Sequence, residues 1–244
     1  MVGNIRLNES KLGSQQYWDD FYKKEIENFN TNSEDTGECW FDDSNAETKI
    51  IEYLLNYFEE GKAADDATIL DVGTGNGHLL FQLHEELSES DVGEKAQFVG
   101  IDYSPHSVLF AKEIANRKYS DVGFKFEQVD LLQKECTFIQ KNQGAFQIVL
   151  DKGTLDAIAL NQQPIAEFGG KIGMEIYASQ VSQMMAEGSI LLITSCNFTE
   201  SELIDVITES GTNDLSVYDR IEYPKIQFGG VEGSTVCSIA FMKK

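Results

Sequence analysis

The amino-acid sequence predicts an α/β fold, a Rossmann-like sheet of seven strands with helices on both faces. Most strands are expected to be parallel, followed by an antiparallel C-terminal hairpin. The main reason is that short apolar runs alternate with helix-patterned segments from residue 67 onward, as in parallel sheets covered on both sides. After residue 211 the pattern changes to two strand-like runs joined by a loop, which predicts the hairpin. The first 60 residues lack strand-like runs, so we expect 1–60 to form a helical cap on a domain spanning 61–244.

The N-terminal cap is expected to contain two helices. Aromatic residues recur at helical spacing around Tyr17, Trp18, Phe21 and Tyr22, and we interpret them as helix-packing side chains rather than ligands. Ser44 followed by Glu47 matches a capping box, in which a hydroxyl and an acid three residues later satisfy the first backbone N–H groups. This predicts a helix over residues 45–60.

The remaining elements follow in alternation along the chain. Strands are expected at 68–72, 97–101, 123–129, 146–150, 189–194, 215–223 and 234–242. Helices are expected at 77–88, at a segment that starts at Ser104-Pro105, at 171–186 and at 199–210. Proline is preorganised for the first helical position, which places the start of the second of these helices. A polar stretch at 88–95 is interpreted as a surface insertion away from the ligand crevice.

The charge of the chain restricts the classes of partner. With 19 basic and 41 acidic residues, the net charge is −22. This argues against binding to a nucleic-acid backbone, which requires excess Lys and Arg, and against docking on an anionic membrane. The acidity either steers a basic partner toward the protein or only keeps the chain in solution, and composition leaves both readings open.

Cysteine and apolar patterns indicate a reduced, cytosolic protein. The spacings between Cys39, Cys136, Cys196 and Cys237 contain no CxxC pair, so no clustered metal site is expected, and each cysteine is expected to be a sheltered thiol. No secretory leader is evident at the start of the sequence, and no apolar run reaches the roughly 18–20 residues of a membrane span.

A glycine-rich turn follows the strand at 68–72. Gly73, Gly75 and Gly77 lie between this strand and the next helix, where a ligand can approach the backbone. A dinucleotide fingerprint requires a third glycine at position 78, but His78 stands there. Asp71, two residues before the first glycine, favours a ligand with an ammonium group, such as the amino-acid tail of S-adenosylmethionine.

Acidic residues also end the following strands. Asp102 ends the second strand, where a carboxylate accepts ribose hydroxyls. Asp130 follows the third strand and is placed to accept from an adenine amino group, and Asp151 ends the fourth. Because open α/β sheets bind ligands at the carboxyl ends of their strands, we expect these acids to converge on one site.

These motifs resemble a known family. The turn DVGTGNG at 71–77 with Ile101-Asp102 looks like the seven-stranded S-adenosylmethionine-dependent methyltransferases. Within them, the sequence resembles the eukaryotic protein-lysine methyltransferases that modify translation elongation factor 1-alpha. The segments that carry this narrower resemblance are LGSQQYW at 12–18, DTGECWF at 35–41, GIDYSP at 100–105, DKGTLDA at 151–157, ITSCN at 193–197 and PKIQFGG at 224–230. It extends from about residue 12 to residue 242.

The resemblance implies S-adenosylmethionine as cofactor, with no metal, and a lysine of elongation factor 1-alpha as methyl acceptor. The residues expected to bind the cofactor are Trp40, Asp71, Gly73, Thr74, Gly75, Asp102, Tyr103, Asp130, Leu131 and Asp151. Those expected to act on or orient the acceptor are Asp151, Asp156 and Asn197, with Trp40 and Phe41 lining a lysine channel. Asp151 is assigned either to the lysine or to the cofactor's amino group. Cys196 is expected to be a buried thiol. The loop at Phe228-Gly229-Gly230 is interpreted as a substrate contact or a structural turn.

Alternatives remain open at this point. The same sheet would serve a methyltransferase for a different protein or a small molecule, or a scaffold that binds the cofactor without catalysis. We expect a monomer that binds neither nucleic acid nor membrane.

Overall fold

The computed structural model describes residues 5–41, 44–209, 214–224, 226–228 and 231–244. Its main sheet has seven strands in the order β3-β2-β1-β4-β5-β9-β6. The strands of this sheet are β1 (Thr68–Val72), β2 (Gln97–Asp102), β3 (Lys125–Gln128), β4 (Phe146–Lys152), β5 (Met185–Ser195), β6 (Leu215–Ile221) and β9 (Cys237–Lys243). β1 to β5 pair in parallel, and β9 pairs antiparallel with both β5 and β6. The predicted sheet and its antiparallel C-terminal hairpin are confirmed.

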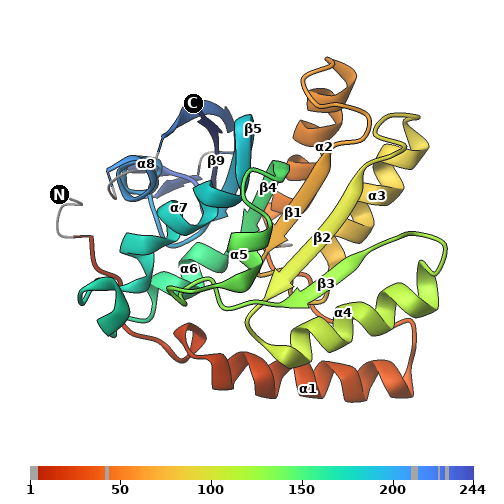
Figure 1. Ribbon diagram of the computed structural model, residues 1–244, viewed down its shortest axis with the longest axis horizontal. Helices are drawn as coiled ribbons and strands as arrows, with labels where there is room; N and C mark the ends of the chain where they lie inside the picture. The colour runs from red at the N-terminus through yellow and green to blue at the C-terminus, as the bar shows by residue number, and fades with distance from the viewer. Residues whose placement is uncertain (1–4, 42–43, 210–213, 225, 229–230) are drawn as a thin grey trace.

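Helices cover both faces of this sheet (Figure 1). The N-terminal helices and those around the first strands are α1 (Gln15–Thr31), α2 (Ala46–Glu59), α3 (His78–Glu89) and α4 (Pro105–Lys118), and a short 3₁₀ turn, η1 (Lys11–Gly13), precedes them. The later helices are α5 (Thr137–Lys141), α6 (Thr154–Ala159), α7 (Gly173–Met184) and α8 (Glu200–Thr208), with a second 3₁₀ turn, η3 (Ala166–Phe168). Two buried clusters result, one between the sheet and α1–α4, the other between the sheet and α5–α8.

The N-terminal segment packs on the rest of the structure through both α1 and α2. Tyr22 and Phe29 of α1 are buried, and the Phe29 ring meets Phe110 of α4 edge-on at a centroid distance of 5.6 Å. Figure 1 shows α1 running beside α4 along one side of the molecule. The cap therefore shares a core with the sheet domain, and its position brings the start of α1 close to the carboxyl ends of the strands.

Helix starts follow local capping rules in two places and depart from them in a third. Ser104 Oγ accepts from Ser107 N–H at 3.3 Å before Pro105, as predicted, and Thr199 and Glu202 form a reciprocal capping box at α8. The capping box predicted at Ser44 and Glu47 is wrong. The residue before α2 is Asn45 at φ 51°, without a side-chain cap. The Glu47 carboxylate is turned to tertiary partners, described below.

Smaller differences occur at the start of β5 and between β6 and β9. Met185, expected on a helix over 171–186, begins β5 directly after α7. Two short strands, β7 (Ile226–Phe228) and β8 (Val231–Gly233), pair within the segment between β6 and β9. The predicted loop glycines Gly229 and Gly230 lie outside the described residues, as does Lys225.

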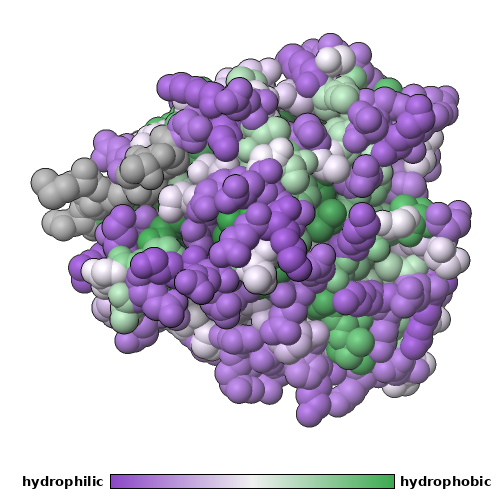
Figure 2. All heavy atoms as spheres, viewed as in Figure 1, coloured by the Kyte–Doolittle hydropathy of each residue, from purple (hydrophilic) through white to green (hydrophobic). Residues whose placement is uncertain are grey.

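Surface properties agree with the composition. Figure 2 shows one face as mostly hydrophilic, with apolar side chains in scattered patches. In the described part of the chain, no helix combines the length and the apolar character of a membrane span.

Candidate active site

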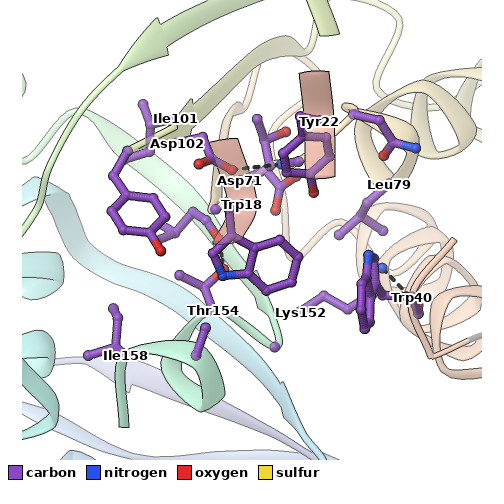
Figure 3. A pocket seen from close by; sticks show the side chains of 18 of the residues that line it. Trp18, Tyr22, Trp40, Asp71, Leu79, Ile101, Asp102, Lys152, Thr154 and Ile158 are labelled. Atoms are coloured by element: carbon purple, nitrogen blue, oxygen red, sulfur yellow. Dashed lines mark hydrogen bonds between the residues drawn. The ribbon is translucent and has the colours of Figure 1, made fainter. Parts of the chain in front are cut away.

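A cavity of about 190 Å³ opens at the carboxyl ends of β1, β2 and β4. This is where the strand order reverses, since β1 lies between β2 and β4, and open α/β sheets bind ligands at such a point. Its walls come from the glycine turn, the loops after β2, β3 and β4, and two segments of the N-terminal cap. Figure 3 shows side chains of these walls, with Trp18, Tyr22 and Trp40 from the cap.

The glycine turn forms one wall of the cavity. Gly73 and Gly75 have φ values of 70° and 59°, which L-residues with side chains rarely adopt. An added Cβ at Gly73 would lie 1.9 Å from Thr154 Oγ1, and one at Gly75 would lie 2.5 Å from the Tyr22 hydroxyl. Conformation and space therefore both require glycine, and the backbone of this turn borders the cavity.

Asp102 ends β2 beside this turn. Its carboxylate accepts from the backbone N–H groups of Gly75 at 3.0 Å and Ser104 at 2.9 Å. Burial raises the pKa of Asp102, and these hydrogen bonds oppose the rise. A carboxylate has about four lone-pair sites, so Asp102 keeps acceptor capacity for a ligand hydroxyl.

Asp71 at the end of β1 is 3% exposed and lines the same cavity. Burial raises its pKa to about 7, although the nearby Lys152 charge acts in the opposite direction. A ligand ammonium group would stabilise the ionised carboxylate in this setting. The two acids expected at the first two strand ends thus face one cavity.

Other residues predicted to bind the cofactor also line the cavity. They are Trp40, Gly73, Thr74, Gly75, Tyr103, Asp130 and Leu131. Asp130 Oδ1 accepts from Leu132 N–H at 2.9 Å, which fixes the carboxyl group at the start of the loop after β3. Acids from three strand ends, Asp71, Asp102 and Asp130, thus line one cavity.

An aromatic wall comes from the cap. The Trp18 and Trp40 rings meet edge-on at a centroid distance of 5.4 Å, and Trp18 Nε1 donates to Leu12 O at 2.8 Å. Trp18 and Tyr22, interpreted from the sequence only as packing residues, line the cavity as well. Helical periodicity identifies such a stripe but cannot tell which part of it reaches a cavity.

We call residues 35–41 the strap, because this segment passes beside the cavity and supplies Trp40 and Phe41 to its wall. Asn76 Nδ2 of the glycine turn donates to Thr36 O at 2.9 Å, and Glu38 N–H donates to Glu25 Oε2 at 3.1 Å. Lys152 Nζ donates to Trp40 O at 3.0 Å, and the Lys152 side chain extends toward Trp40 in Figure 3. The strap is therefore anchored to the glycine turn, to α1 and to the end of β4.

Four polar side chains meet beneath the strap. Glu47 Oε1 lies 2.5 Å from His78 Nδ1, and Glu47 Oε2 lies 3.4 Å from Lys152 Nζ and 3.6 Å from Cys39 Sγ. Hydrogen bonds with Cys39 and Glu47 raise the pKa of His78 to about 10. Burial favours the neutral form of Glu47, but the His78 hydrogen bond and the Lys152 charge outweigh it and lower the Glu47 pKa. These partners, remote in sequence, explain why Glu47 does not cap α2.

None of the residues predicted to act on the acceptor lines the cavity. Asp151 is 1% exposed, accepts from Thr154 N–H at 2.8 Å and Leu155 N–H at 3.0 Å, and also accepts from the Tyr177 hydroxyl. Burial raises the pKa of Asp151 to about 7. Its carboxylate fixes the start of α6 rather than facing a ligand.

Asp156 and Asn197 lie on the same side as Asp151. Asp156 accepts from the Ser195 hydroxyl and from Cys196 N–H at 2.8 Å, which ties α6 to the end of β5. Asn197 N–H donates to Ser195 Oγ at 3.2 Å. Both residues therefore shape the loop after β5.

The register of the sheet explains this division. Asp71 pairs with Leu150, whereas Asp151 pairs with Val72. Side chains of paired residues point to one face and successive residues alternate, so Asp151 faces the α5–α8 side. Lys152 returns to the face of Asp71 and lines the cavity. Sequence reasoning missed Lys152 because the strand end was identified without its register.

The cysteines differ from expectation. Cys136 and Cys237 are buried, but Cys39 is only partly buried and Cys196 is exposed, so the prediction of a buried Cys196 is wrong. The loop after β5 turns its backbone toward Asp156 and leaves position 196 at the surface.

The residues of this cavity fit S-adenosylmethionine. Carboxylates with room for an ammonium group and a ribose lie beside a glycine turn, and aromatic rings cover them. Trp40 Nε1 is buried and has no hydrogen-bond partner within the described structure, so it can donate to a ligand. The donor and acceptor set thus matches a zwitterionic nucleoside better than a pyrophosphate.

Comparisons with known proteins agree with this geometry. A family model described as a methyltransferase domain matches residues 63–230. Protein-lysine N-methyltransferase EFM4 of Saccharomyces cerevisiae is 42% identical, and the match covers 100% of each chain. EEF1A lysine methyltransferase 2 of Mus musculus is 31% identical over 96% of this chain and 85% of its own length. A solved SAM-dependent methyltransferase from Aquifex aeolicus shares the fold, with a TM-score of 0.55 and 17% identity over 82% of this chain and 92% of its own.

Proposed function

The chain belongs to the S-adenosylmethionine-dependent protein-lysine N-methyltransferases, and from this premise we propose that it methylates a lysine side chain of translation elongation factor 1-alpha. The observation that supports the chemistry most is the convergence of Asp71 and Asp102 on one cavity beside the glycine turn. The substrate proposal rests on the mouse relative, which is named for this acceptor and aligns with 96% of the chain.

The cofactor assignments follow from the geometry. We propose that Asp71 holds the ammonium group, that Asp102 accepts the ribose hydroxyls, and that Asp130 accepts from the adenine amino group. The turn from Gly73 to Gly75 provides close backbone contact. Asp102 is pre-oriented for this role, because two backbone N–H groups already fix its carboxylate.

S-adenosylmethionine supplies a methyl group on a positively charged sulfur, which leaves as a neutral thioether with the electron pair of the broken C–S bond. The acceptor amine must arrive without its extra proton, since a free lysine has a pKa of about 10.4. The Lys152 ammonium group in the cavity wall and the positive sulfur of the cofactor lower the pKa of an approaching amine, whereas Asp71 and Asp102 act in the opposite direction. Trp18 and Trp40 restrict water, which strengthens this effect.

We propose that the acceptor loses its proton to solvent as it enters, before the aromatic wall shields it from water. Asp151, Asp156 and Asn197 support this site from behind by fixing α6 and the loop after β5. The net charge of −22 favours the approach of a basic protein. We further propose that the protein acts as a monomer in the cytoplasm and binds no nucleic acid.

The test uses tritiated S-adenosylmethionine and a lysate of cells that lack this protein. Wild-type protein is expected to label one band that co-migrates with elongation factor 1-alpha, whereas Asp102→Ala labels none. Mass spectrometry of that band identifies the lysine and the number of methyl groups. An unlabelled lysate despite intact cofactor binding by calorimetry would contradict the proposal. Labelling of another band would redirect it to a different protein.

A further inference from the structure

Beneath the strap, three side chains from separate parts of the sequence form a group of candidate metal ligands. Cys39 lies on the strap, Glu47 on α2 and His78 on α3. One ligand atom from each residue lies within 4.8 Å of the other two. Glu47 is 7% exposed, and Cys39 and His78 line the cofactor cavity. No CxxC or HxxxH spacing in the sequence indicates this set, because only the fold assembles it.

Thiolate, imidazole and carboxylate are the ligand types that zinc prefers. We propose that Cys39, Glu47 and His78 bind a zinc-class divalent cation that clamps the strap beside the cofactor cavity. The fourth position of the ion is left to water, because Cys39 and His78 border the cavity. This site goes beyond the methyl-transfer function and does not require it.

The ligand atoms lie within 4.8 Å of one another, so binding an ion requires shifts of about 1 Å. Tetrahedral zinc with bonds of about 2.0–2.3 Å places its ligand atoms about 3.3–3.8 Å apart. Cys39 Sγ and Glu47 Oε2 already lie 3.6 Å apart, whereas His78 Nδ1 and Glu47 Oε1 are at 2.5 Å and must separate by about 1 Å. His78 has room for this movement, since its side chain is 31% exposed.

Lys152 Nζ, at 3.4 Å from Glu47 Oε2, is the group that opposes a cation here. Coordination requires a thiolate and a neutral imidazole, so binding of the ion is expected to release protons. The Glu47 carboxylate has two oxygens, Oε1 beside His78 and Oε2 beside Cys39 and Lys152, so one can bind the ion while the other keeps a contact with Lys152.

The clamp has a consequence for the cofactor. The strap carries Trp40 in the cavity wall, and its adjacent Cys39 would be tied to α2 and α3. Movement of the strap away from the cavity then requires a metal–thiolate bond to break. We expect zinc to slow the dissociation of the cofactor.

The test uses Co²⁺, whose thiolate charge-transfer and visible bands report coordination directly. Purified wild-type protein, freed of metal, is titrated with Co²⁺ and then with Zn²⁺. One equivalent is expected to give a thiolate band that Zn²⁺ abolishes. Cys39→Ser should lose the band and bind Zn²⁺ at least tenfold more weakly, with an unchanged circular dichroism spectrum. The matched control, Cys196→Ser, removes an exposed thiol and should keep the band.

Three results would overturn the proposal. They are the absence of a thiolate band in the wild type, a band that persists in Cys39→Ser, and a band that disappears in Cys196→Ser. The first would leave the cluster as an ion pair that holds the strap without metal. A second measurement compares cofactor dissociation with and without Zn²⁺. Zinc is expected to slow it about tenfold in the wild type and not in Cys39→Ser, and equal rates in the wild type contradict the clamp.

Discussion

Two pairs of buried acids lie at the same edge of the sheet but on opposite faces. Asp71 and Asp102 face the cavity on the side of α1–α4, whereas Asp151 and Asp156 face the side of α5–α8. Burial raises the pKa of all four carboxyl groups. Their surroundings differ, because Asp71 and Asp102 line the cavity, whereas Asp151 and Asp156 do not line it and accept from α6, α7 and the end of β5. Whether a strand-end acid faces the ligand cavity or stabilises the fold thus depends on the face of the sheet on which it lies.

The largest expected effect of this difference is on cofactor affinity. Asp102→Ala removes the acceptor for the ribose and leaves Gly75 N–H without its partner. We expect the affinity for S-adenosylmethionine to fall about 100-fold, since hydrogen bonds to a charged group contribute about 1.5–3 kcal/mol each. Calorimetry measures the change, with the thermal unfolding midpoint as a check on folding. An affinity within threefold of the wild type would remove Asp102 from the site.

The second prediction concerns Asp151, on the α5–α8 face of the sheet. Its substitution is expected to lower the stability of the fold. Asp151→Asn replaces one acceptor oxygen by an amide that cannot accept from Thr154, Leu155 and Tyr177 together. The free energy of unfolding is expected to fall by about 1–3 kcal/mol. Urea unfolding measures it, and Tyr177→Phe is the matched control, because it removes one donor of the same group. Unchanged stability in both variants would contradict the structural role.

The third effect is a pH dependence that separates the two faces. Burial raises the pKa of Asp71 to about 7. Its protonated form therefore contributes fully to the stability of the fold below about pH 4, and this contribution is lost as the pH rises through 7. A cofactor ammonium group binds the ionised form, so affinity should rise about tenfold per pH unit below 7 and level off above it. Calorimetry from pH 5 to about 8.5 measures this. Asp71→Asn should remove the slope, and a slope that persists there would assign it to another group.

The smallest expected effect is the response to ionic strength, which should change binding of the protein substrate at the surface more than binding of the cofactor in the buried site. Raising ionic strength from about 0.01 M to 0.15 M shortens the Debye length from about 30 Å to 8 Å and screens the exposed charges. The KM for the protein substrate should rise about threefold, while cofactor affinity should hardly change, because Asp71 and Asp102 are buried. Steady-state kinetics at both ionic strengths measures the two values. Equal responses would show that the net charge does not steer the substrate.

Much of this site is predictable from the sequence because its signals are local. The glycine turn, the strand ends at Asp71 and Asp102, and the proline start of α4 each depend on a few consecutive residues. The face of Asp151 is not predictable in this way, since it follows from the register of β4 against β1. A shift of one residue exchanges Asp151 with Lys152 in the cavity.

Glu47 illustrates a second limit on what the sequence predicts about the site. Its spacing from Ser44 satisfies the capping-box pattern, yet His78 and Lys152 approach it from other elements and bind its carboxylate. A buried carboxylate gains more from two cationic partners than from a single exposed N–H group. Cys39 joins the same cluster only because the strap returns to α2. Clusters that several elements assemble are therefore the part of the site that local patterns do not reveal.

The face on which a strand-end acid lies decides its role, and a matched pair of substitutions tests this most directly. Asp71→Asn and Asp151→Asn each remove one carboxylate whose pKa burial raises to about 7. Calorimetric titration with S-adenosylmethionine above pH 8 compares them under conditions in which both carboxylates of the wild type are ionised. We predict that Asp71→Asn weakens binding at least tenfold and that Asp151→Asn leaves it within threefold. A loss in Asp151→Asn equal to or larger than that in Asp71→Asn would contradict the account.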